Sequence, residues 1–325
     1  MTSLDVSTDA ARRPFSGRRM RLGDLLLQGA AAIAALGALV LVILIAWKVI
    51  QGARLSISTF GLGFLTHVAW DPNPTHLDFG AASFLYGTAI TSVGALILAT
   101  PIAIGVALFL SELAPRGVRG PVTALVETLA AIPSVVIGLW GILVLAPFLR
   151  DHVDPALHST LGFIPLFGPA TYGSNVFTAI VVLTIMILPI IASISRELFL
   201  AVPAELKEGA LGLGMTRWEM IRGVVFPYAR GGVAAAMILG LGRAIGEAIA
   251  VSMVIGGAVG ISINIFQPGQ TLAGQIAGQF TSSTSALFTA SLLYLAVILL
   301  VFSIVANLVA QFVVRRSARH VGSAR

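Results

Sequence analysis

The sequence predicts an all-α membrane protein built as a bundle of six transmembrane helices. Charged residues make up only 10 % of the 325 residues, whereas hydrophobic residues make up 57 %. A typical soluble domain has about 25 % charged residues, so 20 basic and 14 acidic side chains are too few to cover a soluble protein. The charges are also clustered, which leaves apolar stretches longer than the roughly 20 residues needed to cross a bilayer. This composition excludes a disordered chain and argues strongly against a soluble enzyme.

Six apolar segments separate the charged clusters, and each is expected to be helical because hydrocarbon offers no partner to unpaired backbone N–H and C=O groups. They lie near residues 28–50, 83–111, 123–149, 175–198, 230–258 and 286–314. The first follows a basic stretch, as in a signal peptide, but it is longer than a signal-peptide core and no clear cleavage site follows it. It is therefore expected to be a retained anchor helix. The transmembrane domain then covers 28–314, between the tails 1–27 and 315–325.

The positions of lysine and arginine predict which side of the membrane each loop faces. Basic residues concentrate in both tails, in the 112–122 loop and in and beside segment 199–229, whereas only Lys48, Arg54 and Arg150 lie in the opposite loops. The positive-inside rule therefore places both termini and the 199–229 loop in the cytoplasm. The net charge of +6 has this topological meaning, and the basic tails are expected to meet anionic lipid rather than nucleic acid.

The sequence contains no motif for binding ATP or a metal. Its only lysines, Lys48 and Lys207, follow Trp47 and Leu206, so a GxxxxGK[ST] phosphate-binding loop cannot be formed. Any ATP-driven work must come from a partner that binds ATP and magnesium, and no cofactor is expected in this chain. There is no cysteine, and the five histidines lack metal-ligand spacing. An intramembrane enzyme is the least favoured function, since the spans contain no plausible His/Glu metal cluster or Ser/His pair.

Residues 204–220 in the cytoplasmic loop predict a short helix, a glycine break and a second short helix. Thr216 and the glutamate three residues later have the spacing of a capping box, and Leu211, Met215 and Trp218 are expected to protrude. A rigid knob of this kind suits insertion into a groove of another protein. An amphipathic helix lying on the lipid surface fits the same pattern.

The fifth span carries two charges in an otherwise apolar segment, Arg243 and Glu247. A spacing of four places them on one helix face, where they can pair, and each charge costs roughly 2.5–3.5 kcal/mol at mid-bilayer. A planar guanidinium matches two oxygens of an oxyanion, and Glu247 can compete with that anion for Arg243. We therefore interpret both as residues of a substrate pathway. The alternative is a buried ion pair that only fixes helix packing.

Glycines and prolines in the spans have two interpretations each. Gly242 and Gly246 have a GxxxG spacing, which permits close helix packing or local unwinding beside a pathway. Pro133 and Pro189 are expected to kink the third and fourth spans, either around a pathway or as packing irregularities.

Polar residues elsewhere are less informative. Glu127, at the start of the third span, is expected either to face a pore or to extend to the membrane interface, and Glu112 is expected at the interface. Residues 259–285 carry no charge but several Gln, Ser and Thr side chains, which predicts a polar outer loop that is partly re-entrant.

The cytoplasmic loop resembles the EAA loop of ABC importer permeases. Glu208-Gly209-Ala210, Gly214 and Phe226-Pro227 match its spacing, with glycine at 209 where the family has alanine. Val224 and Phe226 also depart, standing where the family has isoleucine and leucine. In that family the loop contacts the nucleotide-binding subunit.

Further motifs are similar to those of the phosphate-specific ABC transporter permeases, over spans two to six. They are Tyr86-Gly87-Thr88 with Pro101 and Glu112, the stretch from Ile132-Pro133-Ser134 to Trp140-Gly141, and Gly242-Arg243-Ala244-Ile245-Gly246-Glu247. Ile137 stands where tyrosine is expected. The long outer loop after the first span resembles the C-type of the two permease types in this branch.

The resemblance implies a type I importer permease fold in the cytoplasmic membrane of a prokaryote, and a transport subunit rather than an enzyme. The implied partners are a second similar permease, two copies of a cytoplasmic ATP-binding subunit, an external phosphate-binding protein and inorganic phosphate. Arg243 and Glu247 are implied in translocation. Two alternatives remain: the same architecture importing sulfate or molybdate, and a secondary carrier driven by an ion gradient.

Overall fold

The computed structural model describes residues 22–73, 76–170 and 172–322. It divides into two units, of which the first ends at Lys48 and the second starts at Val49. The first unit contains the N-terminal part of helix α1 (Leu22–Phe60), whose side chains from Leu26 to Ile45 are exposed. Most of the expected N-terminal tail lies outside the described residues, although α1 already begins at Leu22.

Within the described residues, six helical stretches are long and apolar enough to cross a membrane, which confirms the expected number. They cover Leu26–Leu65, Ala82–Leu113, Ser134–Leu161, Val176–Leu200, Arg217–Gly246 and Ala286–Val314. The chain is therefore a multi-pass membrane protein. The last of these stretches belongs to a helix that continues to Gly322, so the expected C-terminal tail is helical over most of its length.

The second unit contains a small hairpin and twelve further α-helices among its described residues. The antiparallel strands are β1 (Trp70–Asp71) and β2 (Asp78–Phe79), with Trp70 opposite Phe79. The long helices are α2 (Ala82–Leu108), α7 (Val176–Leu200), α10 (Phe226–Gly246) and α13 (Ala286–Gly322). The shorter ones are α3 (Arg116–Ala131), α4 (Ser134–Trp140), α5 (Ala146–Phe148), α6 (Asp154–Leu161), α8 (Ala204–Gly212), α9 (Arg217–Met220), α11 (Ile249–Val254) and α12 (Leu272–Gln279). Single 3-10 turns cover Gly61–Leu65, Pro165–Phe167 and Phe280–Ser282, and π-helical turns cover Phe109–Leu113, Gly141–Leu145, Leu149–Val153 and Ile221–Val225.

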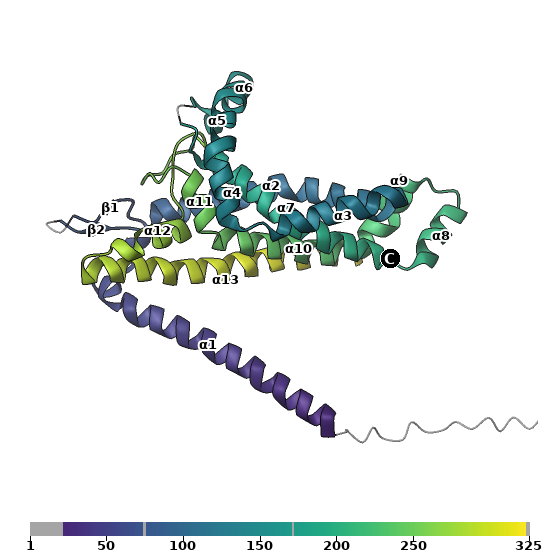
Figure 1. Cartoon of the computed structure of the whole chain (residues 1–325), viewed down its shortest axis with the longest axis horizontal. Helices are drawn as coiled ribbons and strands as arrows, with labels where there is room; N and C mark the ends of the chain where they lie inside the picture. Colours follow the sequence, from purple (N-terminus) through teal and green to yellow (C-terminus); the bar gives the residue numbers. More distant parts are fainter. Residues whose placement is uncertain (1–21, 74–75, 171, 323–325) are drawn as a thin grey trace, which may run out of the picture. The chain divides into compact units, whose positions relative to one another are not determined.

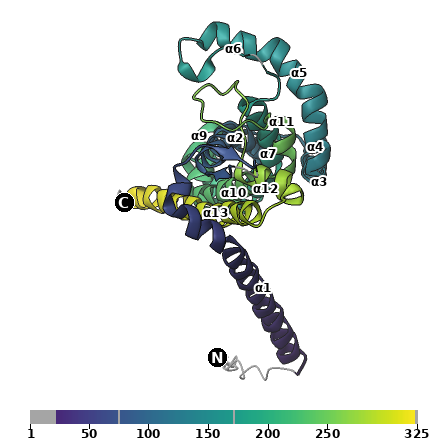
Figure 2. The same ribbon diagram turned by 90° about the vertical axis from the view of Figure 1, so that its left-hand side faces the viewer.

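Helix α7 is the central helix of this unit and packs against both α2 and α10 (Figures 1 and 2). Of its most apolar window, 61 % is buried, more than in any other candidate span. Helix α2 presents buried alanines to this core at every fourth position, namely Ala95, Ala99, Ala103 and Ala107. Such a row of small side chains allows two helices to approach closely. The fully buried side chains that α2 contributes to this core are therefore small, while Ile90, Leu96 and Val106 pack against its margin.

The expected third span, 123–149, is not one helix. Helix α3 ends at Ala131, Ile132 and Pro133 are extended with ψ of 128° and 138°, and α4 starts at Ser134. Proline lacks an N–H and its ring disfavours the helical conformation of the preceding residue. The chain turns sharply there (Figure 1), so the kink expected at Pro133 is a complete break. Pro189, in contrast, lies inside the uninterrupted helix α7.

The uncharged segment after α11 is held against the start of α2 by the motif Tyr86-Gly87-Thr88. The Tyr86 hydroxyl donates to the Ser262 carbonyl at 2.7 Å, and the Thr88 hydroxyl accepts from the Leu272 N–H at 2.9 Å. A Cβ on Gly87 would lie 2.1 Å from the Gln270 carbonyl oxygen, so only glycine permits this approach. These motif residues therefore fix the loop between α11 and α12.

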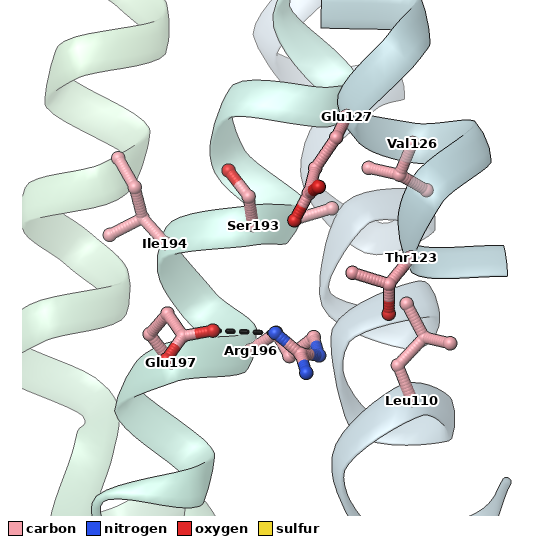
Figure 3. Close-up of a pocket in the computed structure, with 9 residues that line it drawn as sticks. Leu110, Thr123, Val126, Glu127, Ser193, Ile194, Arg196 and Glu197 are labelled. Atoms are coloured by element: carbon pink, nitrogen blue, oxygen red, sulfur yellow. Dashed lines mark hydrogen bonds and ion pairs between the residues drawn. The ribbon is translucent and has the colours of Figure 1, made fainter. Parts of the chain in front are cut away.

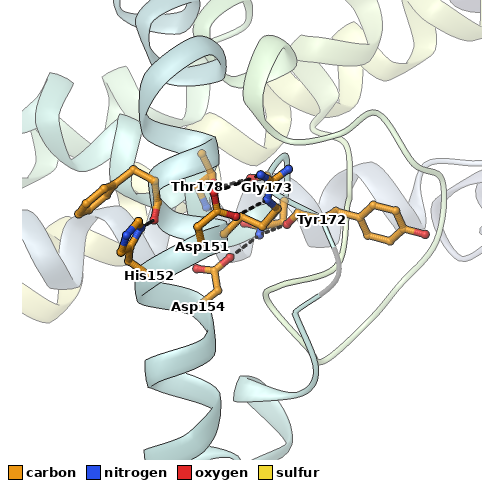
Figure 4. A network of polar contacts seen from close by, with 9 residues as sticks. Asp151, His152, Asp154, Tyr172, Gly173 and Thr178 are labelled. Atoms are coloured by element: carbon orange, nitrogen blue, oxygen red, sulfur yellow. Dashed lines mark hydrogen bonds and ion pairs between the residues drawn. The ribbon is translucent and has the colours of Figure 1, made fainter.

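A polar network joins α6 to the start of α7 (Figure 4). The Asn175 side-chain oxygen caps α7 by accepting from the Thr178 N–H at 2.8 Å, and its amide donates to Asp154 at 3.1 Å. Asp154 is fully buried. Because Asn175 satisfies a free N–H at the helix start, it fixes where α7 begins.

Candidate functional site

Arg243 and Glu247 do not lie on one continuous helix, contrary to the spacing argument. Helix α10 ends at Gly246, and Glu247 has extended backbone with φ −74° and ψ 119°. A Glu247 oxygen instead accepts from the N–H of Ala250 at 3.3 Å, in the first turn of α11. Among the described residues, no ion pair links Arg243 to Glu247. The expected fifth span, 230–258, is therefore two helices joined at Glu247 and Ala248.

Arg243 lies on the exposed face of α10. The same face carries Tyr228, Gly231, Ala235 and Leu239, whereas the opposite face packs against the core. The guanidinium has no hydrogen-bond or ion-pair partner anywhere in the described ranges of the chain. An unpaired charge within the bilayer is costly and usually faces protein or a water-filled cavity. This face of α10 is thus suited to an aqueous route or to a second subunit.

The two glycines beside Arg243 do not form a tight helix contact within this chain. A Cβ on Gly246 would meet no atom within 4 Å, and one on Gly242 would only reach the Asn307 side chain at 3.9 Å. Close approach to α7 occurs one turn earlier, where a Cβ on Gly240 would lie 2.8 Å from Ile191. Gly242 lies inside α10 and Gly246 is its last residue, so the helix ends directly after this pair.

The segment 204–220 folds as expected into helix α8, a glycine turn and helix α9. Gly214 has φ of +86°, a left-handed conformation that favours glycine. Thr216 and Glu219 form a complete capping box, with the Thr216 N–H donating to Glu219 at 2.8 Å. Leu213 and Trp218 are 85 % and 65 % exposed, so this knob offers apolar side chains that no other described part of the chain covers.

The residues that match the EAA loop divide into exposed and buried positions. Glu208 and Gly209 are exposed on α8, whereas Ala210 is buried against the core at this end of the bundle. A Cβ on Gly209 would meet no atom within 4 Å, so the alanine of the family pattern would also fit here. Pro227 is the second residue of α10, which directly follows the π-helical turn Ile221–Val225 within one continuous helical stretch from Arg217 to Gly246.

Three contacts attach the α8–α9 segment to the ends of α2 and α7, and the sequence did not predict them. The Lys207 ammonium pairs with Glu112 at 2.6 Å and donates to the Phe199 carbonyl at 3.0 Å. Arg217 donates to the Glu112 carbonyl at 3.2 Å. We call this cluster of Glu112, Lys207 and Arg217 the latch. Glu112, which is expected at the membrane interface, is 9 % exposed and pairs with Lys207. Since Lys207 lies 95 residues after Glu112, no local pattern could reveal the pair.

Within the described ranges, no group of three or more His, Asp or Glu side chains is arranged to hold a metal ion. The ion pairs found there are His67–Asp78, Arg150–Asp151, Arg196–Glu197 and Glu112–Lys207. The first two lie in the loops expected on the outer side, away from α8 and α9. The candidate site therefore consists of the exposed face of α10 around Arg243 and of the knob with its latch.

Comparison with known proteins identifies the family of the chain. Residues 99–319 match the family described as binding-protein-dependent transport system inner membrane component. The chain is 41 % identical over 329 residues to the phosphate transport system permease protein PstC of Mesorhizobium japonicum, covering 99 % of this chain and 100 % of the relative. It is 42 % identical over 279 residues to PstC of Pasteurella multocida, covering 85 % of this chain and 86 % of that relative.

Two solved transporters share the fold. A bacterial alginate ABC transporter aligns with a TM-score of 0.59 at 16 % identity, covering 92 % of this chain and 98 % of that one. An inward-facing MetNI methionine ABC transporter aligns with a TM-score of 0.52 at 20 % identity, covering 72 % of this chain and 94 % of that one. At such identities the similarity shows the fold alone, and that fold is the one expected from the sequence.

Proposed function

The chain belongs to the family of binding-protein-dependent transport system inner membrane components, and from this premise we propose that it is the permease subunit of an ATP-driven importer of inorganic phosphate. The relatives named as phosphate transport permeases support the substrate, because they align over nearly the whole chain. The motifs around Tyr86, Pro133 and Arg243 point to the same branch.

The observation that carries the proposal is the unpaired guanidinium of Arg243 on the exposed face of α10. It is held by a helix whose other face is buried, so its position is fixed by the core. A guanidinium can donate two parallel hydrogen bonds to phosphate oxygens. Phosphate would take the place of a carboxylate partner of Arg243 within the chain. Its interaction with Arg243 must stay weak enough for the anion to be released.

A second, similar permease subunit packed opposite α10 would enclose the substrate route. Arg243 would then face protein rather than lipid. Two copies of an ATP-binding subunit would take up the knob of α8 and α9, with Leu213 and Trp218 in a groove. The distribution of basic residues places that knob and both termini in the cytoplasm. An external phosphate-binding protein would deliver the anion to the loops on the opposite side.

The cycle follows from these contacts. Binding of ATP draws the two knobs together and opens the route outward, so that phosphate enters from the external protein. Hydrolysis separates the knobs and opens the route toward the cytoplasm. We expect the nucleotide to bind to the partner subunit, because this chain has no phosphate-binding loop.

Uptake of radiolabelled phosphate by proteoliposomes that contain the complete complex tests the proposal. Arg243→Gln should abolish uptake while the complex still assembles, and Arg54→Gln, which removes an exposed arginine near the opposite end, is the matched control. Normal uptake by Arg243→Gln would refute the role of Arg243. Stronger competition by unlabelled sulfate or molybdate than by phosphate would favour the other oxyanions.

The secondary-carrier alternative makes a different prediction for the same vesicles. Uptake that continues without ATP and without the ATP-binding subunit, and follows an imposed ion gradient, would refute an ABC importer. Deletion of residues 205–220 should release the ATP-binding subunit on purification and stop uptake.

A further inference from the structure

A cavity of about 200 Å³ lies between α3, α7 and the π-helical turn after α2. Its polar lining comes from Thr123 and Glu127 on α3 and from Ser193, Arg196 and Glu197 on α7 (Figure 3). One water needs only roughly 10–15 Å³ of such space, so the cavity has room for a larger polar guest. Arg196 lies four residues before the end of α7, at the end of the bundle that carries the knob.

Two hydrogen-bond donors in this cavity have no partner. The Thr123 Oγ1 and Arg196 Nε atoms are buried and make no hydrogen bond to any described residue. A buried donor that has lost water and gained no protein acceptor is destabilising, so both groups call for an acceptor inside the cavity. Glu197 engages only the Nη1 atom of Arg196, so the Nε–H of Arg196 remains free to donate to a guest in the cavity.

Glu127 supplies an acceptor in the same cavity. Its carboxylate is directed toward Ser193 (Figure 3), and it has no hydrogen-bond or ion-pair partner among the described residues. An ionised carboxylate accepts hydrogen bonds and cannot donate them. A guest must therefore present both an acceptor, toward Arg196 and Thr123, and a donor, toward Glu127.

From this donor and acceptor set we propose that the cavity binds protonated inorganic phosphate and rejects sulfate. At neutral pH inorganic phosphate retains at least one P–O–H group, which donates to Glu127, while its other oxygens accept from Arg196 Nε and Thr123 Oγ1. Sulfate has no proton at that pH, so its oxygens would face the Glu127 carboxylate with no hydrogen bond between them. Unpaired like charges of this kind are an effective means of excluding the wrong ligand.

The same reasoning separates free phosphate from a phospholipid headgroup. The phosphodiester of a lipid offers acceptor oxygens but no proton for Glu127, so it satisfies only half of the cavity. The two carboxylates also leave the lining with more negative than positive charge, which makes phosphate binding weak. A weak site suits transient binding of a transported anion, and the inference rests on the proposed function, which supplies phosphate as that anion.

Binding is measured on the purified, nucleotide-free complex without the external phosphate-binding protein, from the broadening of the phosphorus NMR line of inorganic phosphate. We expect the broadening to persist in Arg243→Gln. In Arg196→Gln we expect the affinity for phosphate to fall about ten- to a hundredfold, as for the loss of a hydrogen bond to a charged group. Arg54→Gln is the matched control and should behave as the wild type. Thr123→Val changes shape little and should weaken binding even if Arg196→Gln disturbs the fold.

Competition by sulfate tests the role of Glu127. Sulfate should leave the phosphate signal of the wild type unchanged and should displace phosphate in Glu127→Gln, whose amide can donate to a sulfate oxygen. Equal competition by sulfate in the wild type, or loss of all binding in Arg243→Gln, would overturn the proposal. The proposal would also be overturned if free phosphate did not bind and phospholipid copurified with the wild type but not with Arg196→Gln. A complex that imports phosphate and fails these tests lacks this site only, whereas a complex that imports none refutes the proposed function itself.

Discussion

The latch of Glu112, Lys207 and Arg217 predicts that transport and ATP hydrolysis can be separated by one substitution. Lys207→Met removes the ammonium that joins α8 to both Glu112 and the Phe199 carbonyl, while keeping most of the side-chain length. The knob would still enter the ATP-binding subunit, because its exposed side chains are unchanged. Its movement would no longer be passed to α2 and α7.

The size of the effect follows from burial. Removing one partner of a buried ion pair costs about 3–5 kcal/mol, and a hydrogen bond to a charged group contributes about 1.5–3 kcal/mol. Glu112 is 9 % exposed and Lys207 is 18 % exposed, so the pair lies between these cases and we expect about 2–4 kcal/mol. At a tenfold change per 1.4 kcal/mol, the attached state of the knob becomes about 30- to 700-fold less favoured relative to the detached state.

The assay is the ratio of phosphate imported to ATP hydrolysed in proteoliposomes with the complete complex. Lys207→Met and Glu112→Gln should each lower this ratio while ATP hydrolysis continues, and the double variant should lose little more than either single variant, because the two side chains share one interaction. Lys207→Arg should retain most of the coupling. Additive losses in the double variant, or an unchanged ratio in the single variants, would refute the latch.

Substitutions at three further positions test local features of the fold. Gly87→Ala should lower the stability of the complex by about 1–3 kcal/mol, because its Cβ would meet the Gln270 carbonyl at 2.1 Å; an unchanged melting temperature would contradict this contact. Gly209→Ala should slow amide hydrogen exchange in α8 by stabilising the helix up to about 1 kcal/mol, since space surrounds that position; faster exchange would contradict it. Glu247→Ala should destabilise the start of α11 by about 1 kcal/mol through loss of the acceptor for Ala250, whereas Glu247→Gln keeps an oxygen there. Loss of transport in both variants, with stability lost only in the alanine variant, would assign a second role to the charge.

The sequence was sufficient where the decisive signal is local. Six apolar stretches identify the candidate spans because hydrocarbon forces every backbone group in them to bond internally. The capping box at Thr216 and the glycine at Gly214 each depend on residues within one turn, and both are found as expected. Proline was a less complete signal: Pro133 ends a helix where only a kink was expected, whereas Pro189 lies inside the uninterrupted helix α7.

Contacts between residues far apart in the sequence could not be predicted from such local patterns. The break after Gly246 has apolar residues on both sides. The hydropathy pattern therefore predicts one continuous span, with Arg243 and Glu247 on the same helix. The Glu112–Lys207 pair and the cavity between Arg196 and Thr123 depend on how α2, α3 and α7 pack. Each of these charged residues was visible in the sequence, but its partner was not.

The packing of α7 connects the two parts of the candidate site. Its last turn accepts a hydrogen bond from Lys207 through the Phe199 carbonyl, and eight residues earlier Ile191 lies against Gly240 of α10, closer than any larger residue at 240 would allow. Arg243 follows Gly240 by less than one helical turn. Because close-packed interiors transmit displacement rather than absorb it, a movement of the knob in the proposed transporter shifts α7 and with it the segment of α10 that holds Arg243. The latch therefore offers a direct mechanical path from the knob, where we propose that the ATP-binding subunit docks, to Arg243, with Gly240 as the point where α7 and α10 engage.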